Sequence, residues 1–265
     1  MEINKIYNMD CLQGMKDIPD GSIDMILCDL PYGVTRNSWD SMVPLEDLWR
    51  QYKRIIKDNG AICLHADGMF MAMLMMSQPK LWRYNLVWDK VLTSGFLNAN
   101  RMPLRRTEEI CVFYKKQPTY NPQKSVGSRN HGKGKIVGKL VDGTNTSNNN
   151  YGNYVAVDNS AESGTQKHPT SLLRFQKTHP SKALHPTEKP VSLCEYLIKT
   201  YTNPGELVLD NCIGSGTTSV AAIRTGRNFI GFEITEDYCR IANQRNAEAY
   251  KTLNSKPIKE DYIKC

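Results

Sequence analysis

The sequence lacks any apolar run near the roughly 18 residues that a helix needs to cross a bilayer. Its first residues, Met1 to Lys5, also lack the basic segment and following apolar stretch of a secretory signal. We therefore expect a cytoplasmic protein. Because 40% of the 265 residues are still hydrophobic, the chain can bury a full core, either as one large domain or as a domain with a smaller insertion.

Cysteines with metal-binding spacing and an excess of acidic residues are absent as well. The eight cysteines are scattered without a Cys-x-x-Cys motif, and no histidine is spaced to complete a zinc site. We expect reduced thiols, many of them in the core, and no metal. The formal charge of +7 and the isoelectric point near 8.9 suit a polyanionic partner, although many basic proteins bind none.

Strand and helix signals alternate along most of the chain, which is typical of a doubly wound α/β sheet. The apolar run Ile23 to Cys28 predicts a buried strand, and a 3.6-residue apolar period predicts a helix from Pro44 to about Lys57, ended by Asn59-Gly60. Further strands are expected at Ile3–Tyr7, Ala61–Leu64, Tyr84–Trp88, Ile110–Tyr114, Leu207–Leu209 and Asn228–Phe232. Further helices are expected near Cys11–Met15, Met69–Met76, Leu193–Tyr201, before Thr225 and at Asp237–Tyr250.

Two segments of the first half need a choice between interpretations. The five methionines between Met69 and Met76 suit an adaptable binding surface, but we favour a helix that faces the core. The stretch from Leu92 to Arg106 is polar and is expected to be a loop.

The composition changes between Gln117 and Thr178 to Gly, Asn, Ser, Lys and Pro, with few periodic apolar residues. Such a segment can bury little apolar surface, which is too little to offset the entropy lost when it becomes ordered, so we expect an insertion. Basic residues and tyrosines alternate within it. A solvated linker is the alternative, and we favour contact with nucleic acid.

The segment Asp29-Leu30-Pro31-Tyr32 directly follows the strand predicted at Ile23 to Cys28. In an open α/β sheet, ligands bind beyond the carboxyl ends of the strands, so an acid, a proline and an aromatic residue there indicate a site. Asp-x-Pro is also an ordinary turn sequence, and this alternative stays open on spacing alone.

A second signal lies between a strand and a helix near the end of the chain. Gly214 and Gly216 permit close approach of a ligand to the backbone, and Glu233, at the end of the next strand, suits ribose hydroxyls. A dinucleotide site would have a third glycine where Ser219 stands, and the lysine of a P-loop is absent. S-adenosylmethionine carries no phosphate, and Asp210 suits its positive charge.

Four motifs together resemble the amino-group DNA methyltransferases of the bacterial and phage β class: Asp29–Tyr32, His185–Pro190, Asp210–Thr218 and Gly231–Glu233. The resemblance implies a Rossmann-like methyltransferase fold that uses S-adenosylmethionine, with a mostly parallel seven-stranded sheet and an inserted target-recognition region. It divides the chain into a catalytic half (1–116), the target-recognition region (117–178), a cofactor-binding half (179–254) and a tail (255–265).

The resemblance also implies the roles of individual residues. The catalytic motif comprises Asp29, Leu30, Pro31 and Tyr32. The cofactor would be held by Asp10, Cys11, Asp29, Thr187, Lys189, Asp210, Asn211, Cys212, Gly214, Ser215, Gly216, Thr217, Thr218 and Glu233. In particular, Asp10 would contact the adenine ring of the cofactor, and Thr187 and Lys189 would lie near its methionine end. DNA would be contacted by Trp39, Arg101, Arg105, Arg129, Lys133 and Lys135.

The sequence departs from the family pattern at two places. Asn211-Cys212 replaces the usual Pro-Phe, which removes an aromatic wall from the cofactor pocket. Leu30 replaces the first proline of the catalytic motif, but the family needs only a backbone carbonyl there, and Pro31 still favours an extended Leu30.

An aspartate at position 29 favours methylation of adenine N6 in a base flipped out of double-stranded DNA, with cytosine N4 as the alternative. A DNA-binding protein with a decayed active site, a dinucleotide oxidoreductase and an RNA or protein methyltransferase are further alternatives. The resemblance leaves open whether the chain forms a homodimer and whether it has a cognate restriction endonuclease.

Overall fold

The computed structural model describes residues 1–33, 42–128, 146–148, 152–154, 165–177 and 188–255. The chain divides into two compact units. Unit 1 comprises Met1–Asn121 and Ser171–Cys265, and unit 2 comprises Pro122–Thr170. The boundaries predicted for the insertion, 117 and 178, lie slightly outside those of unit 2, and the division of unit 1 into a catalytic and a cofactor-binding half stays a prediction.

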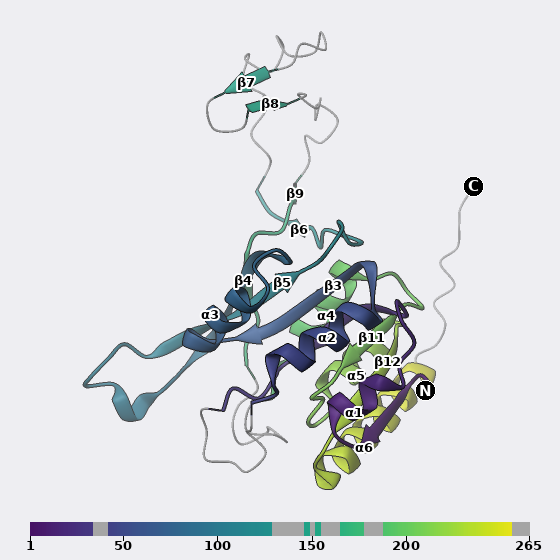
Figure 1. The fold of residues 1–265 in the computed structure, drawn as a ribbon. Coiled ribbons are helices and arrows are strands. Elements are labelled where there is room, and N and C mark those ends of the chain that lie inside the picture. Colours follow the sequence, from purple (N-terminus) through teal and green to yellow (C-terminus); the bar gives the residue numbers. More distant parts are fainter. Residues whose placement is uncertain (34–41, 129–145, 149–151, 155–164, 178–187, 256–265) are drawn as a thin grey trace. The chain divides into compact units, whose positions relative to one another are not determined.

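Unit 1 is built on a sheet with helices on both faces (Figure 1). The strands are β1 (Lys5–Asn8), β2 (Ile23–Cys28), β3 (Ile56–Ala66), β4 (Trp82–Ser94), β5 (Arg105–Phe113), β10 (Leu172–Arg174), β11 (Leu207–Asp210) and β12 (Asn228–Glu233). The helices are α1 (Cys11–Lys16), α2 (Leu45–Ile55), α3 (Gly68–Ser77), the short 3-10 helix η1 (Phe96–Asn98), α4 (Val191–Tyr201), α5 (Thr217–Arg224) and α6 (Glu236–Asn254).

The order of the strands in this sheet is β1-β12-β11-β2-β3-β5-β4-β10. β5 pairs antiparallel with both of its neighbours, and all other neighbouring pairs are parallel. The mostly parallel sheet with one reversed strand is therefore confirmed. The described sheet has eight strands instead of the seven that the resemblance implies, because the short strand β10 adds to the edge beside β4.

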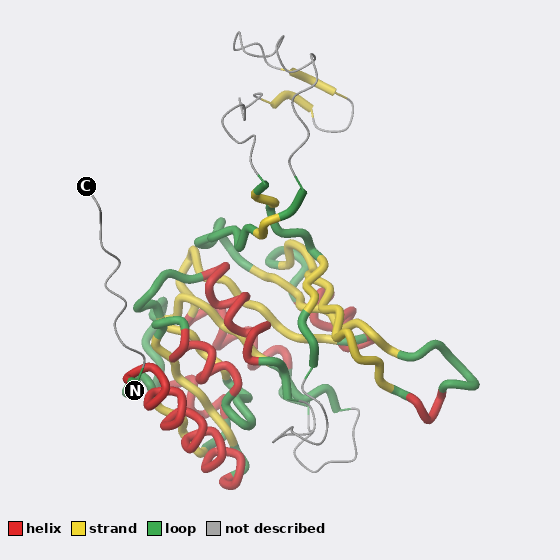
Figure 2. The backbone as a smooth tube through the Cα atoms, turned by 180° about the vertical axis from the view of Figure 1, so that it is seen from behind, coloured by secondary structure: helices red, strands yellow, loops and turns green. Residues whose placement is uncertain are grey.

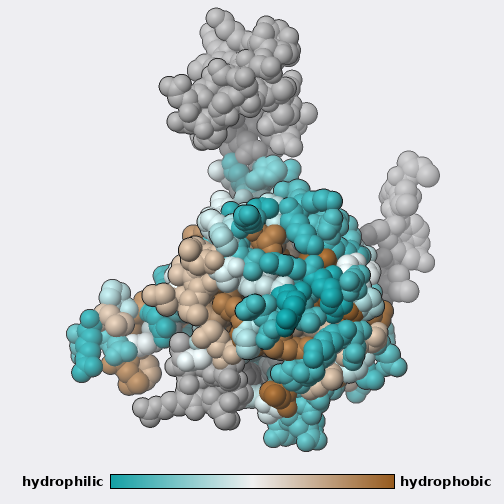
Figure 3. All heavy atoms as spheres, viewed as in Figure 1, coloured by the Kyte–Doolittle hydropathy of each residue, from teal (hydrophilic) through white to brown (hydrophobic). Residues whose placement is uncertain are grey.

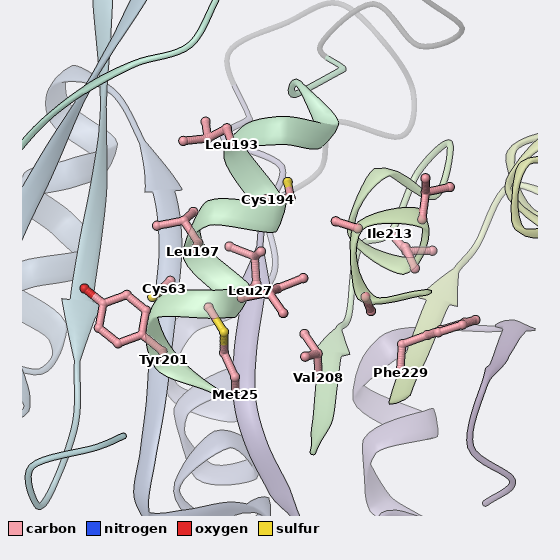
Figure 4. Close-up of a cluster of buried hydrophobic side chains, with 14 of the residues drawn as sticks. Met25, Leu27, Cys63, Leu193, Cys194, Leu197, Tyr201, Val208, Ile213 and Phe229 are labelled. Atoms are coloured by element: carbon pink, nitrogen blue, oxygen red, sulfur yellow. The ribbon is translucent and has the colours of Figure 1, made fainter. Parts of the chain in front are cut away.

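The two faces of the sheet are covered by different halves of the chain (Figures 1 and 2). Buried residues of α1, α2 and α3 pack on one face in a cluster that includes Trp49 and Phe113. Buried residues of α4, α5 and α6 pack on the other. Figure 4 shows Leu197 and Tyr201 of α4 on this second face, close to Leu27 and Cys63 of the central strands.

The boundary between α2 and β3 differs from the prediction. The helix ends at Ile55, and Asn59-Gly60 lies within β3 instead of terminating the helix. A Cβ atom at Gly60 would lie 2.8 Å from the backbone oxygen of Asp24 in β2. This glycine therefore permits close packing of β2 against β3, a tertiary requirement that the local sequence does not reveal.

The segment expected as a loop at 92–106 is an arm formed by the ends of β4 and β5 with η1 between them. Four of its apolar side chains are exposed: Phe96, Leu97, Met102 and Leu104. Figure 3 shows hydrophobic residues, in brown, near the end of this projecting arm.

Helix α3 faces the core with only part of its surface. Phe70 and Leu74 are buried, and Met69, Met73 and Met76 are exposed. Met71 and Met75 pack against the core, so the prediction of a helix that faces the core is confirmed, and its three exposed methionines lie away from that face.

Unit 2 contains two short antiparallel pairs in its described parts. β6 (Ser125–Val126) pairs with β9 (Gln166–Lys167), and β7 (Thr146–Asn148) pairs with β8 (Gly152–Tyr154). Across the parts of the chain that the structure describes, no helix has the length and apolar character needed to span a bilayer.

Candidate active site

Four acidic residues mark the carboxyl ends of four adjacent parallel strands. Asp10 follows β1, Glu233 ends β12, Asp210 ends β11 and Asp29 follows β2. These strands are neighbours in the sheet although they come from the two ends of the chain. Because this edge is where open α/β sheets bind ligands, the fold brings the two sequence signals into one site.

Asp29 is held by two side-chain hydrogen bonds. The Tyr32 hydroxyl donates to Asp29 Oδ1 at 3.0 Å, and Lys189 Nζ donates to Oδ2 at 2.5 Å. Phe70 stacks on one face of the Tyr32 ring, with 4.6 Å between ring centroids. The side chain of Leu30 is buried in the core, so the predicted catalytic motif is anchored at its second residue as well.

Asp29 is ionised at neutral pH despite its burial. Burial favours the protonated acid, but the Lys189 ammonium and the hydrogen bonds to the carboxylate lower the pKa below its ordinary value. Asp29 is therefore a hydrogen-bond acceptor with a full negative charge, and a weak proton acceptor.

The glycine loop before α5 is fixed through Glu233. The backbone N–H of Gly214 donates to Glu233 Oε2 at 2.9 Å, and the N–H of Thr235 donates to Oε1 at 2.8 Å. Gly214 and Gly216 have positive φ angles of 53° and 85°. A Cβ atom at Gly216 would lie 2.7 Å from Cβ of Ala242 in α6, so glycine is required there by both conformation and space.

Asp210 is a buried carboxyl at the centre of the row. Burial raises its pKa to about 6, while hydrogen bonds from the Thr218 hydroxyl and the Cys212 N–H act in the opposite direction. The charge of Asp29 contributes to the rise. An ionised carboxylate that is partly desolvated is well suited to hold a cation.

Arg245 is a residue of this site that the sequence analysis missed. From α6, its guanidinium donates to the backbone oxygen of Ser215 at 2.8 Å and to Glu188 Oε1 at 2.8 Å. It thereby joins the glycine loop to the segment that carries Lys189. A lone basic residue in a predicted helix is no signal for such a role.

The two residues that replace Pro-Phe have different surroundings. Asn211 is buried and accepts a hydrogen bond from the Tyr52 hydroxyl of α2. Cys212 is partly exposed, and its sulfur lies 3.5 Å from the Asn211 amide nitrogen. The Asn211 side chain thus belongs to the interface between the sheet and α2.

The charged side chains of this site fit a cationic nucleoside cofactor that carries no phosphate. Asp210 and Glu233 are acidic, and they would repel a phosphate. The nearby ammonium of Lys189 is already bound to Asp29 instead of lying free for an anion.

The structure describes most of the predicted site residues. Cys11 begins α1 and Asp10 caps that helix by accepting a hydrogen bond from the Gln13 N–H at 3.0 Å. Ser215, Thr217 and Thr218 are buried at the start of α5. Lys189, which the resemblance assigns to the cofactor, instead donates to Asp29 in this structure.

The predicted DNA contacts are only partly described. Arg101 and Arg105 lie on the arm between β4 and β5, and Arg105 forms a 3.3 Å ion pair with Asp67. Several predicted residues lie outside the described residues: Trp39, Arg129, Lys133, Lys135 and Thr187.

Comparisons with known proteins match most of the chain. The N6/N4 methylase family model, described as DNA methylase, matches residues 23–244. The type II methyltransferase M1.MboII of Moraxella bovis is 29% identical, over 92% of this chain and 96% of its own length. The DNA adenine methyltransferase YhdJ of Escherichia coli is 27% identical, over 92% of this chain and 83% of its own.

Two solved structures share the fold. The complex of M1.HpyAVI with S-adenosylmethionine has a TM-score of 0.60 at 24% identity and covers 91% of this chain and 98% of its own. The cytosine-N4-specific PvuII DNA methyltransferase has a TM-score of 0.63 at 15% identity and covers 96% of this chain and 95% of its own.

Proposed function

Because this chain belongs to the N6/N4 amino-group DNA methylase family, we propose that it methylates the exocyclic N6 amine of adenine in DNA. The transfer of a methyl group from S-adenosylmethionine to a DNA amino group is the activity of the family. The choice of adenine is supported by the ionised carboxylate of Asp29 at the carboxyl end of β2.

Asp29 and Leu30 prepare the amine for reaction. The lone pair of an exocyclic amine is delocalised into the ring, so the amine is a poor nucleophile. Hydrogen bonds from the amine to the Asp29 carboxylate and to the Leu30 carbonyl favour a tetrahedral nitrogen and orient its lone pair. The role of Leu30 needs only its backbone, which agrees with the burial of its side chain.

The acidic row and the glycine loop would hold the cofactor. Glu233 would accept hydrogen bonds from ribose hydroxyls, Asp210 would lie near the positive charge, and Gly214 to Gly216 would allow close backbone approach. When bound, S-adenosylmethionine supplies an electrophilic methyl group on a sulfonium. Arg245 keeps the loop in place through Ser215.

The target base must leave the duplex to reach Asp29. Tyr32 would stack on the flipped base with the ring face opposite Phe70, which holds the Tyr32 ring in position. Basic residues of the arm and of unit 2 would contact the DNA backbone. A homodimer and a cognate endonuclease stay predictions of the resemblance.

The test uses the full chain, S-adenosylmethionine with a tritiated methyl group, and unmethylated DNA of mixed sequence. The DNA is digested to nucleosides and separated. We expect label in N6-methyl-2′-deoxyadenosine, and label in N4-methyl-2′-deoxycytidine alone would contradict the proposal. DNA binding without transfer would support the decayed-site alternative.

The matched variant is Asp29→Ala, which removes the proposed acceptor and leaves the cofactor loop unchanged. We expect the rate of transfer to fall by at least about 100-fold, as for other preorganised groups. Binding of S-adenosylmethionine should change little. Equal turnover by the variant would contradict the mechanism.

A further inference from the structure

Asp29 belongs to a larger group of charged side chains on one face of the sheet. The group also contains Glu108 of β5, Lys90 of β4 and Lys189, which precedes α4. Lys189 Nζ lies 2.5 Å from Asp29 Oδ2 and 3.5 Å from Glu108 Oε2, so one ammonium lies between two carboxylates. The Lys189 side chain is only 10% exposed.

The two oxygens of Glu108 have different partners. Oε1 accepts a hydrogen bond from Lys90 Nζ at 3.1 Å. Oε2 is buried and makes no hydrogen bond with any residue that the structure describes. Its 3.5 Å ion pair with Lys189 is longer than a charge-assisted hydrogen bond, so Glu108 presents an acceptor that this ammonium can approach more closely.

The charges of this group balance. Burial opposes the ionisation of Glu108, but Lys189 and Lys90 lower its pKa. Burial likewise opposes the charge on Lys189, but the two carboxylates raise its pKa. His65, whose ring lies edge-on to Trp88, stays neutral because burial lowers its pKa to about 4. Two carboxylates and two ammonium groups therefore share a buried region.

We propose that Glu108 is a positioning residue for methyl transfer, which takes the Lys189 ammonium from Asp29 when the amino group of the target base enters. This inference rests on the proposed function and adds a residue to it. Lys189 then binds Asp29 when no base is present and binds Glu108 when the base is in the site.

The exchange needs a small movement. A shift of Lys189 Nζ by about 1 Å would convert the 3.5 Å ion pair into a charge-assisted hydrogen bond, and a flexible lysine side chain permits it. Once Lys189 has left, the negatively charged Oδ2 of Asp29 accepts a hydrogen bond from the amino group of the base. The net charge of the group stays the same, but Asp29 loses its nearest cation, so its carboxylate then depends on the hydrogen bonds from the Tyr32 hydroxyl and from the entering amino group.

The test is Glu108→Gln in the full chain, with Glu109→Gln as the matched control from the same strand. The glutamine keeps the shape of Glu108 but attracts Lys189 less, so Lys189 should stay on Asp29. We expect the single-turnover rate of methyl transfer to fall by about 10- to 100-fold. The affinities for DNA and S-adenosylmethionine should stay near those of the wild type, and Glu109→Gln should match the wild type throughout. The midpoint of thermal unfolding should fall in Glu108→Gln, because Lys90 loses its buried ion pair, so the rates are measured well below that midpoint.

A double-mutant cycle with Lys189→Met separates positioning from a structural effect. Because Glu108 acts through Lys189, replacing Glu108 in the Lys189→Met background should change the rate little further. Should Glu108→Gln fold poorly, Glu108→Asp keeps the charge beside Lys90 but withdraws the carboxylate, and we expect an intermediate rate from it.

Two results would overturn this inference and leave the proposed function standing. One is an active wild-type chain whose rate Glu108→Gln matches, and the other is a double variant in which the two rate losses multiply. A wild-type chain that transfers no methyl group to DNA overturns the proposed function and this inference with it.

Discussion

At the scale of one residue, we expect Asp210 to couple cofactor binding to pH. Its pKa is raised to about 6 by burial, so its charge is lost as the pH falls through that value. Because the ionised form attracts a cation, we expect the affinity for S-adenosylmethionine to fall by up to about tenfold per pH unit below the pKa of Asp210. Calorimetric titrations between about pH 5 and about pH 8 measure this dependence.

The variant Asp210→Asn tests the assignment. It should lose this pH dependence and bind the cofactor more weakly near neutral pH. Since the raised pKa means that ionised Asp210 destabilises the fold above about pH 6, the variant without cofactor should also unfold at a higher temperature there. Asp237→Asn, at an exposed position of α6, serves as the control. A pH dependence that persists in Asp210→Asn would assign it to another group.

Single residues of the site differ in how far they could be predicted. Asp29, Asp210 and Glu233 were predicted to follow or end strands, and the structure describes them at those positions. The partners that hold them were not predictable. Arg245 reaches Glu188 across 57 positions of sequence, and Lys189 reaches Asp29 across 160. Such pairs depend on the packing of whole elements, which no local pattern encodes.

At the scale of elements, the glycine loop packs directly on α6. Gly216 has φ +85° and no space for a Cβ atom beside Ala242, whereas Gly205 has φ +84° and nothing within 4 Å. Gly216→Ala adds both backbone strain and overlap, so we expect the free energy of unfolding to fall by about 2 to 4 kcal/mol. Gly205→Ala adds only the strain and should cost about 1 kcal/mol.

Urea denaturation of both variants, followed by circular dichroism, measures the difference. Because the overlap also displaces the loop that ends at Gly216, the Gly216→Ala chain should bind S-adenosylmethionine more weakly even where it is folded. Equal losses in the free energy of unfolding of the two variants would mean that α6 moves away from the loop without destabilising the fold.

Elements were predicted well where their own sequence decides them. The strand at Ile23–Cys28 has the predicted bounds because its apolar run is buried on both faces. The end of α2 was misplaced because Asn59-Gly60 is a helix-stop signal, but Gly60 in fact meets the backbone of β2. The strands beside the arm were predicted too short because β4 and β5 extend beyond their apolar centres.

At the scale of the molecule, the two compact units predict a separation of tasks. We expect a chain in which 122–170 is replaced by a short Gly-Ser linker to fold and to bind S-adenosylmethionine, because the described acids of the site all lie in unit 1. Its rate of methyl transfer to DNA should fall by at least about 100-fold, since the base would no longer be positioned.

Thermal unfolding and calorimetry on this shortened chain establish whether unit 1 is intact, and the tritium assay measures transfer. Methylation of the same DNA sites at the wild-type rate would mean that unit 1 reads DNA alone. Loss of cofactor binding in a folded chain would place part of the cofactor site in the deleted segment.

The fold class was predictable because alternating strand and helix signals, together with four motifs in a fixed order, allow few arrangements. The order of the strands was not evident from the residues alone. β1 lies beside β12, a pairing that joins the two ends of the chain and that no local pattern indicates. The edge strand β10 was missed because three residues in a polar segment give no periodic signal.

The pairing of β1 with β12 also sets the time at which the protein can become active. The backbone N–H of Phe229 donates to the side-chain oxygen of Asn4 across 225 positions. At ribosomal rates of about 5–20 residues per second, the first strand therefore waits roughly 10 to 45 s for its partner. The row of acids is complete only when β12 has emerged. A nascent chain therefore carries Asp29, the proposed catalytic residue, long before the site for the methyl donor is complete.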